Sequence, residues 1–372
     1  MKVRSLLFST LCVVAMSAAL TACSNDEEDS FNDEGSVVEL PHKRAFILNE
    51  GKYKANNSGI AFYAPDGDAK ESKNNFIADL YKVQNQKSLG DSGFDMIAYD
   101  DHIYVVVYGS KLLLKLNEAG VEQKQLTFGE ADGQPRCLEA KDGKIYVSLY
   151  SGKVARIDAS TLAIEAYVSV NANPEQMVIE DDKLYVANSG WGSGNTVSVI
   201  DLATFNKLED IPLVVNPNYL LEANGEIYAI SYGAWNDPVT SYSFQRIKAD
   251  GTLEIIPAKA SVFAEHNDII YLIDSKTDWK NHTAINTLCT YNAKTHELNT
   301  TSFLKEMPET LKNSIIYGIS INEKDGDIYL LTSNYASGSP INGDVYRFSA
   351  NGTFVETFDC GGINPKKIVF ID

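Results

Sequence analysis

A short alternation of apolar and polar residues, built around one aromatic residue, recurs along the chain. It reads HIYVVVY at Tyr104, KIYVSLY at Tyr146 and EIYAISY at Tyr228, and a weaker copy, RAFILNE, contains Phe46. A period of two residues places successive side chains on opposite faces of a strand and is not the pattern of a helix. The pattern therefore predicts a chain built from β-strands. The other copies are centred on Tyr185, Tyr271 and Tyr329.

The spacing of these copies defines a repeating unit. Most copies lie 39–43 residues apart, and eleven residues before six of them a small residue or proline opens a second apolar strand. A tight turn such as KDGK separates the two strands, and further strands such as GKVARID follow after a loop. Units of four strands and about 40–45 residues are typical of propeller blades. The opening positions are Gly93, Pro135, Pro174, Pro217, Ala260 and Gly318.

The two ends of the repeat region complement each other. The Phe46 copy has no strand of the opening type before it, whereas the C-terminal NPKKIVFID contains Pro365 and has no aromatic strand after it. We expect this last strand to complete the first blade and to close the ring, which leaves no open sheet edge. The predicted fold class is all-β, a seven-bladed β-propeller over residues 43–372.

The first 42 residues differ in composition from the repeats. Lys2 and Arg4 precede an apolar run of 15 residues, Leu6 to Leu20, which is shorter than the roughly 20 residues that span a membrane. This is the layout of a secretory signal in residues 1–22. Residues 24–39 contain seven acidic residues and no basic residue, a composition typical of disordered segments. We expect residues 23–42 to form a tether, of which residues 24–39 could reach roughly 55 Å if extended.

The end of the signal carries a further feature. Leu20-Thr21-Ala22-Cys23 resembles the bacterial lipobox, which implies cleavage before Cys23 and a lipid on its sulfur. The alternative is an ordinary cleaved signal followed by a chance cysteine. The acidic residues directly after Cys23 resemble the export signal that sends Bacteroidetes lipoproteins to the outside of the outer membrane. A tether that faces the periplasm is the alternative location.

Charge and cysteine content narrow the class of function. The formal net charge is −18, and removal of residues 1–22 takes away Lys2 and Arg4 and no acid, which gives −20. Such a chain is not expected to bind nucleic acid, whose binding proteins carry basic patches, and only the lipid would hold it to a membrane. The cysteines of the repeat region show no metal-ligand spacing and are expected to be buried thiols. They are Cys137, Cys289 and Cys360.

The alternating strand directions sort the loops onto two faces. The start of each opening strand and the end of each aromatic strand must share one face, which we call the top face, and the tight turns must lie on the bottom face. Top loops are longer, and aromatic residues concentrate in them. Because the core already has ample Val, Ile and Leu, we hypothesise a ligand platform there; the alternative is that these rings only pack the loops. The aromatic residues are Trp191, Trp235, Trp279, Tyr53, Tyr150, Tyr232 and Tyr335.

The starts of the opening strands should surround the central channel. Their polar and aromatic residues mix hydrogen-bond donors with acceptors, which suits an amide-rich or sugar-like ligand better than a single phosphate. A structural role, in which these groups bind channel water and loose backbone, is the alternative. The candidates are Asp95, Arg136, Gln176, Asn218, Tyr219 and Lys366.

Signals for catalysis, metals and cofactors are weak. There is no HExxH or GxSxG, and SGWGSGN opens between strands rather than onto a helix. Asp325-Gly326-Asp327 lacks the terminal Glu of an EF-hand and reads as a hairpin turn. We therefore expect no catalytic residue, no metal and no cofactor, although a Ser-His-Asp set cannot be tested by spacing. The histidines are scattered at His42, His102, His266, His282 and His296.

One repeat carries a family resemblance. LYVANSGWGSGNTVSVIDLAT resembles the YVTN repeat, and residues 43–372 resemble the YncE-like propellers of Bacteroidetes surface lipoproteins, most of all in FILNEGKYKANNSGIAFY. One branch of that family, the BtuG-type proteins, captures vitamin B12 and docks on a TonB-dependent transporter. The resemblance implies a surface lipoprotein that captures a small nutrient, with a corrinoid such as cobalamin as the ligand it suggests. It transfers no individual ligand residue. The alternatives are a non-catalytic scaffold for proteins or glycans, and a propeller lactonase or lyase.

Overall fold

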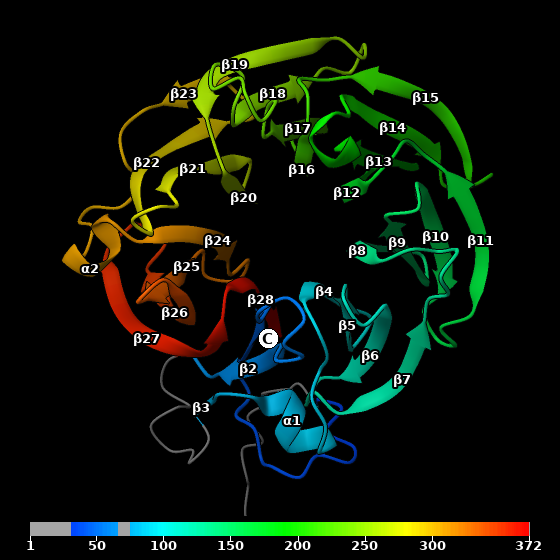
Figure 1. Cartoon of the computed structure of the whole chain (residues 1–372), viewed down its shortest axis with the longest axis vertical. Coiled ribbons are helices and arrows are strands. Elements are labelled where there is room, and N and C mark those ends of the chain that lie inside the picture. The colour runs from blue at the N-terminus through cyan, green and yellow to red at the C-terminus, as the bar shows by residue number, and fades with distance from the viewer. Residues whose placement is uncertain (1–30, 66–74, 372) are drawn as a thin grey trace, which may run out of the picture. The chain divides into compact units, whose positions relative to one another are not determined.

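The strands of the chain pair into antiparallel sheets of four strands each. The computed structural model describes residues 31–65 and 75–371. In this part of the chain, seven such sheets stand around a central opening (Figure 1). The all-β, seven-bladed propeller predicted from the repeats is therefore confirmed. The predicted signal segment and the lipidation site Cys23 lie outside the described residues.

Each sheet has the same order from the channel outward. The first strands, which line the channel, are β28 (Pro365–Ile371), β4 (Gly93–Tyr99), β8 (Pro135–Lys141), β12 (Pro174–Glu180), β16 (Pro217–Ala223), β20 (Val262–His266) and β24 (Ile315–Ile321). The second strands are β1 (Arg44–Asn49), β5 (His102–Val107), β9 (Lys144–Leu149), β13 (Lys183–Asn188), β17 (Glu226–Ser231), β21 (Ile269–Asp278) and β25 (Ile328–Ala336). The third strands are β2 (Gly59–Tyr63), β6 (Leu112–Asn117), β10 (Lys153–Asp158), β14 (Thr196–Asp201), β18 (Ser243–Ile247), β22 (Thr283–Asn292) and β26 (Ser339–Phe348).

The outer strands complete the blades. They are β3 (Phe76–Ile77), β7 (Glu122–Thr127), β11 (Ile164–Ser169), β15 (Asn206–Pro212), β19 (Leu253–Lys259), β23 (Glu297–Asn299) and β27 (Phe354–Ile363). The short helices are α1 (Leu80–Asn85), α2 (Glu309–Lys312) and a 3₁₀ turn at Gly190–Gly192. No helix among the described residues is both long and apolar enough to cross a membrane.

The ring closes through a pairing between the two ends of the repeat region. The C-terminal β28 runs antiparallel to β1, with Phe46 opposite Val369 and Leu48 opposite Lys367. The first blade thus has the order β28-β1-β2-β3, so three of its strands come from the start of the region and one comes from its end. This is the closure that NPKKIVFID predicts.

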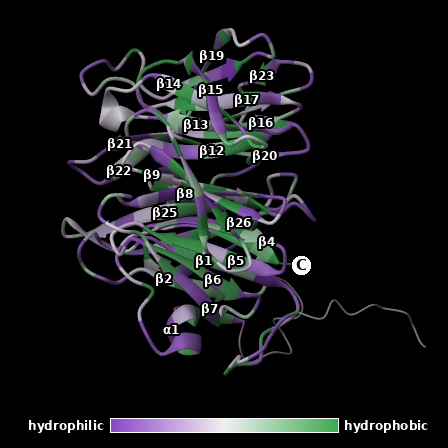
Figure 2. Ribbon diagram, turned by 90° about the vertical axis from the view of Figure 1, so that its right-hand side faces the viewer, coloured by the Kyte–Doolittle hydropathy of each residue, from purple (hydrophilic) through white to green (hydrophobic). Residues whose placement is uncertain are grey.

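The aromatic residue of each repeat lies on the second strand and packs between blades. Tyr104, Tyr228 and Tyr329 are fully buried, as is Phe46. A cation on the third strand lies directly opposite some of these tyrosines: Tyr104 pairs with Lys115, and Tyr329 pairs with Arg347. The charged ends of these side chains lie over the rings: Lys115 Nζ is 5.7 Å from the centre of the Tyr104 ring, and the guanidinium carbon of Arg347 is 5.8 Å from that of Tyr329. Figure 2 shows apolar residues concentrated in the strands and polar residues in the loops.

The N-terminal segment of the described chain differs from the tether that its composition predicts. Instead of remaining free as far as residue 42, the segment that begins at Phe31 packs against the first two blades. The Arg44 side chain, 2 % exposed, donates to Asp33 Oδ1 at 2.6 Å and to the Glu118 carbonyl at 2.9 Å, and it lies over the Phe31 ring. The acidic composition did not predict this packing, because Asp33 counts as one more acidic residue although it pairs with the buried Arg44. The extended reach of roughly 55 Å expected for residues 24–39 is therefore too long.

This contact makes Asp33 a stabilising residue. Asp33→Ala leaves the buried Arg44 without its carboxylate, and we expect a loss of about 1–2 kcal/mol in the free energy of unfolding. The control is Glu34→Ala, which removes the same charge from an exposed side chain without a described hydrogen bond and should change stability by less than about 0.5 kcal/mol. Urea unfolding of both variants measures the difference. Equal stability of the two variants would contradict the assigned contact.

Candidate ligand-binding channel

Six of the seven first strands bulge where they begin, at the top face. In β4, Gly93 lies opposite Val107 and Asp95 opposite Val106, so Phe94 is an extra residue without a partner. The same irregularity occurs in β8, β12, β16, β24 and β28. A bulge leaves its extra residue outside the ladder and changes the direction of the side chain. The bulged positions are Phe94, Arg136, Cys137, Glu175, Gln176, Asn218, Tyr317 and Lys366.

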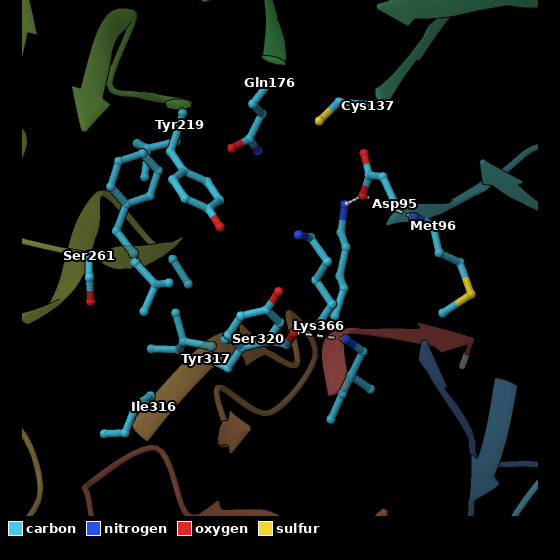
Figure 3. Close-up of a pocket in the computed structure, with 18 of the residues that line it drawn as sticks. Asp95, Met96, Cys137, Gln176, Tyr219, Ser261, Ile316, Tyr317, Ser320 and Lys366 are labelled. Carbon is cyan, nitrogen blue, oxygen red and sulfur yellow. Dashed lines mark hydrogen bonds and ion pairs between the residues drawn. The ribbon is translucent and has the colours of Figure 1, made fainter. Parts of the chain in front are cut away.

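The bulged residues line a cavity of about 1200 Å³ along the axis of the ring. Its top end includes Glu50 and Trp279, and its bottom end includes Glu265 and Lys324. In Figure 3, Gln176, Tyr219 and Asp95 project toward the middle of the cavity, whereas Met96 projects away from it. The six channel residues predicted from the sequence all line this cavity: Asp95, Arg136, Gln176, Asn218, Tyr219 and Lys366.

Arg136 is held by a carboxylate and by aromatic rings. Its Nε donates to Glu175 Oε2 at 2.8 Å, and its guanidinium carbon lies 3.4 Å from the centre of the Phe94 ring and 4.7 Å from that of Tyr150. The same Glu175 accepts hydrogen bonds from the hydroxyls of Tyr150 and Ser189. Burial opposes the charge of Arg136, but Glu175 outweighs it and raises the arginine pKa above its ordinary value. Arg136 is therefore a permanent, rigidly placed cation.

Lys366 provides a second cation on the same ring. Its Nζ lies 3.5 Å from the centre of the Phe94 ring, and the nearest carboxylate oxygen, Glu50 Oε2, is 4.0 Å away. That Glu50 oxygen accepts a hydrogen bond from the hydroxyl of Tyr317. Burial raises the pKa of Tyr317 well above its usual range, so the hydroxyl remains a donor at neutral pH. Both cations and both carboxylates are thus fixed near the top of the channel.

Below this level the polar groups satisfy one another. Asp95 accepts a hydrogen bond from Lys367 Nζ at 2.9 Å and one from the backbone N–H of Leu138 at 2.9 Å. Desolvation raises the pKa of the neighbouring Glu139 to about 8, although Lys367 counteracts it. The Asp95 carboxylate, predicted as a ligand contact, thus joins strands β4, β8 and β28.

The opposite wall of the channel is aromatic. Tyr219 packs against Tyr232, with ring centres 6.0 Å apart, and against Phe263 at 6.2 Å. The side-chain amide of Asn218 donates to Asn216 and so supports the bulge. Gln176 Oε1 is buried and accepts no hydrogen bond from the described residues.

The aromatic residues predicted on the top loops fall into two groups. Trp191, Trp235 and Trp279 are 69 %, 77 % and 58 % exposed, and Tyr53 is also exposed. The other three are half-buried, as the loop-packing alternative expects of them. Their contacts are Tyr150 with Glu175, Tyr232 with Tyr219 and Tyr242, and Tyr335 stacked on His282 at 4.1 Å.

Sequence reasoning missed four residues of the site: Phe94, Glu175, Tyr317 and Glu50. Phe94 and Glu175 directly follow the opening residues Gly93 and Pro174. The residue directly after the opening residue is therefore the position that predicts both of them. Tyr317 precedes its expected opening residue Gly318, because the bulge in β24 lies two residues further from the aromatic residue of its repeat than the bulge in β4 does. Nothing in the repeat marks Glu50 as a partner for Lys366.

Other chemistry has little support among the described residues. No group of three or more His, Cys, Asp or Glu side chains there could hold a metal ion. Cys137, Cys289 and Cys360 are free and buried, as predicted. Burial raises the pKa of each thiol, which keeps these cysteines protonated at neutral pH.

These features define a class: a closed seven-bladed propeller whose axial cavity is framed by bulged strands and lined by charged, aromatic and apolar side chains. The chain belongs to the family described as a domain of unknown function, DUF5074, whose model matches residues 43–370. A search of curated proteins finds no match.

Solved structures show the fold alone. The hydrazine synthase of Kuenenia stuttgartiensis is similar at 16 % identity and a TM-score of 0.55, over 70 % of this chain and 77 % of that one. A streptogramin B lyase is similar at 12 % identity and 0.53, over 72 % and 82 %. The WD40 propeller of Doa1 is similar at 10 % identity and 0.53, over 79 % and 87 %.

The raised pKa of Glu139 predicts a dependence of stability on pH. The folded state holds its proton up to about pH 8, whereas the unfolded chain releases it near pH 4. This contribution to stability is complete below the unfolded pKa and is lost as pH rises toward 8. Between pH 6 and 9, the free energy of unfolding of the wild type should fall by about 1–2 kcal/mol more than that of Glu139→Gln. This range is smaller than the pKa difference alone would give, because the Glu139 side chain is only half-buried.

Denaturant unfolding at the two pH values measures this difference. Glu209→Gln removes the same charge from the exposed outer strand β15 and serves as the control. A wild-type protein that responds to pH as Glu139→Gln does would contradict the prediction.

Proposed function

We propose that this protein is a lipid-anchored binding propeller that captures a small nutrient molecule at the outer surface of the outer membrane and passes it to a TonB-dependent transporter. The axial cavity supports this proposal most, because its top end combines fixed charged groups with the exposed Trp279. Concave sites with few, well-placed polar groups are typical of small-molecule binding.

The tryptophan arrangement favours ligand contact over loop packing for three of the seven aromatics. Trp279 lines the cavity itself. Trp191 lies beside Tyr150, with ring centres 6.3 Å apart, and has a φ of 53°, which is unfavourable for a bulky side chain. Trp235 continues the surface, since its indole lies over Gly192, where a Cβ would be 2.1 Å from Nε1. A strained backbone that holds a ring in solvent is more typical of a functional site than of a packing residue.

A corrinoid is the ligand that we propose on the basis of the family resemblance. Its flat, largely apolar macrocycle suits the tryptophans, and its amide groups suit the mixed donors and acceptors of the channel. We propose binding without catalysis and without a bound cofactor.

The partner part of the proposal has its own support. The long hairpins β21–β22 and β25–β26 carry the exposed apolar residues Ile285 and Ile341 in adjacent blades. Stacking of His282 on Tyr335 joins the two hairpins. We assign these two exposed apolar residues to contact with the transporter. The same surface would serve the alternative function, a scaffold for proteins or glycans.

Titration of soluble protein with cyanocobalamin tests the proposal. The protein should begin at Ser24, because a start within residues 31–41 removes contacts to Arg44. We expect micromolar or tighter binding by calorimetry, and at least about 100-fold weaker binding when Trp191, Trp235 and Trp279 are all changed to Ala, because each ring buries apolar area against the ligand.

Tyr167→Ala, which removes an exposed aromatic from the outer strand β11, is the control and should bind as wild type does. Wild type that does not bind cyanocobalamin would contradict the corrinoid assignment. Unchanged affinity of the triple variant would contradict the platform.

A further inference from the structure

We infer that Gln176 is the centre of an amide subsite at the top of the channel, where its side-chain carboxamide pairs with an uncharged carboxamide group of the ligand. The inference rests on the proposed function in taking the channel as the ligand site. It adds to that function a residue that recognises the amide group and a selection against charged groups.

The first argument is that the whole carboxamide of Gln176 has no partner. Gln176 lies on the bulge of β12 and projects toward the middle of the cavity (Figure 3). Its Oε1 is buried and accepts no hydrogen bond from the described residues, and its Nε2 donates none to them. Buried polar atoms are almost always hydrogen-bonded, because an unsatisfied one costs free energy. A primary carboxamide removes that cost, since it can donate to Oε1 and accept from Nε2.

The second argument is that the charges around Gln176 are already balanced. Three cations line the upper channel and each lies beside one of three carboxylates, so their formal charges sum to zero. The pairs are Arg136 with Glu175 at 2.8 Å, Lys367 with Asp95 at 2.9 Å, and Lys366 with Glu50 at 4.0 Å. The neighbouring Glu139 is protonated at neutral pH and adds no charge. A ligand carboxylate or ammonium would bring an unpaired charge into this set, and burial of an unpaired charge is costly.

The third argument is that free donors and free acceptors stand at the same level. The terminal nitrogens of Arg136 donate to no described residue, and Glu50 Oε1 accepts from none. The Arg136 guanidinium carbon and Lys366 Nζ lie 3.4 Å and 3.5 Å from the centre of the Phe94 ring. Two such groups cannot occupy one face of a ring at this distance, so the ring separates them and they do not share one anion. A group that both donates and accepts suits this level better than an anion does.

The opposite wall supplies an apolar surface for the part of the ligand that carries the amide. Tyr219 projects from β16, the first strand next to β12, toward the middle of the cavity (Figure 3). Its ring packs against Phe263, with ring centres 6.2 Å apart. The combination defines a ligand class: an uncharged molecule in which a carboxamide is attached to a flat apolar group.

Three small probes that share one ring test the subsite without any assumption about the nutrient. Soluble protein that begins at Ser24 is titrated by calorimetry with benzamide, with benzoate and with benzylamine, at pH 7 and low salt. We expect saturable binding of benzamide with a Kd of about 10 mM or tighter. Benzoate and the benzylammonium ion should bind at least about tenfold more weakly, because each brings an unpaired charge.

Gln176→Leu keeps the size of the side chain and removes its amide. Affinity for benzamide should fall at least about tenfold. The urea midpoint of the free protein should rise, because the variant lacks the buried acceptor without a partner; a residue with only a structural role would lower it. The matched control is Gln125→Leu on the exposed outer strand β7, which should bind benzamide as wild type does.

Two further variants test the charge balance in opposite directions. Glu50→Gln leaves Lys366 without its carboxylate, so affinity for benzoate should rise at least about threefold. Lys366→Gln leaves Glu50 without its cation, so affinity for benzylammonium should rise by a similar factor.

The subsite is overturned if wild type binds none of the three probes, or binds a charged probe as tightly as benzamide. Equal benzamide binding by wild type and Gln176→Leu, or unchanged probe preference in both charge variants, would also overturn it. A failure to bind cyanocobalamin would not affect these results, so the two proposals fail separately.

Discussion

The pairing of β28 with β1 joins the two ends of the repeat region, and the other features of the ring depend on it. In an open ring, the first blade would lack its channel strand, and β1 would present an unpaired edge. Closure also brings Lys366 to the top of the channel beside Phe94 and Glu50, although Lys366 lies more than 270 residues from Phe94 in the sequence. The same interaction that completes the fold therefore completes the candidate site.

The bulges of the first strands place side chains along the channel of this closed ring. A regular first strand would keep every residue in register with its partner, and the side chains would alternate between the two neighbouring blades. In six of the strands, one extra residue near the start interrupts that alternation of side chains. Arg136, Glu175 and Lys366 are among the bulged residues, and all three line the channel.

The chain also shows how acidic composition can mislead. A run of acids with no basic residue predicts a solvated segment, yet Asp33 lies against Arg44, and the chain from Phe31 onward packs on the blades. Composition counts charges but does not locate the buried cation that one of them neutralises. The exposed tryptophans are the opposite case, since their position in long top loops was visible in the sequence and their exposure agrees with it.

The sequence by itself determined the strand period, the number of blades, the closing strand and the six channel residues that line the cavity. These follow from local patterns that every blade repeats, because each blade must bury the same two faces. Only the tertiary structure decided which residues meet: Arg136 with Glu175, Lys366 with Phe94 and Glu50, and Asp95 with Lys367. All of these contacts except that of Lys366 with Glu50 join different blades. The two-residue shift at Tyr317 follows from the longer turn between β24 and β25, which the fixed interval of eleven residues does not record.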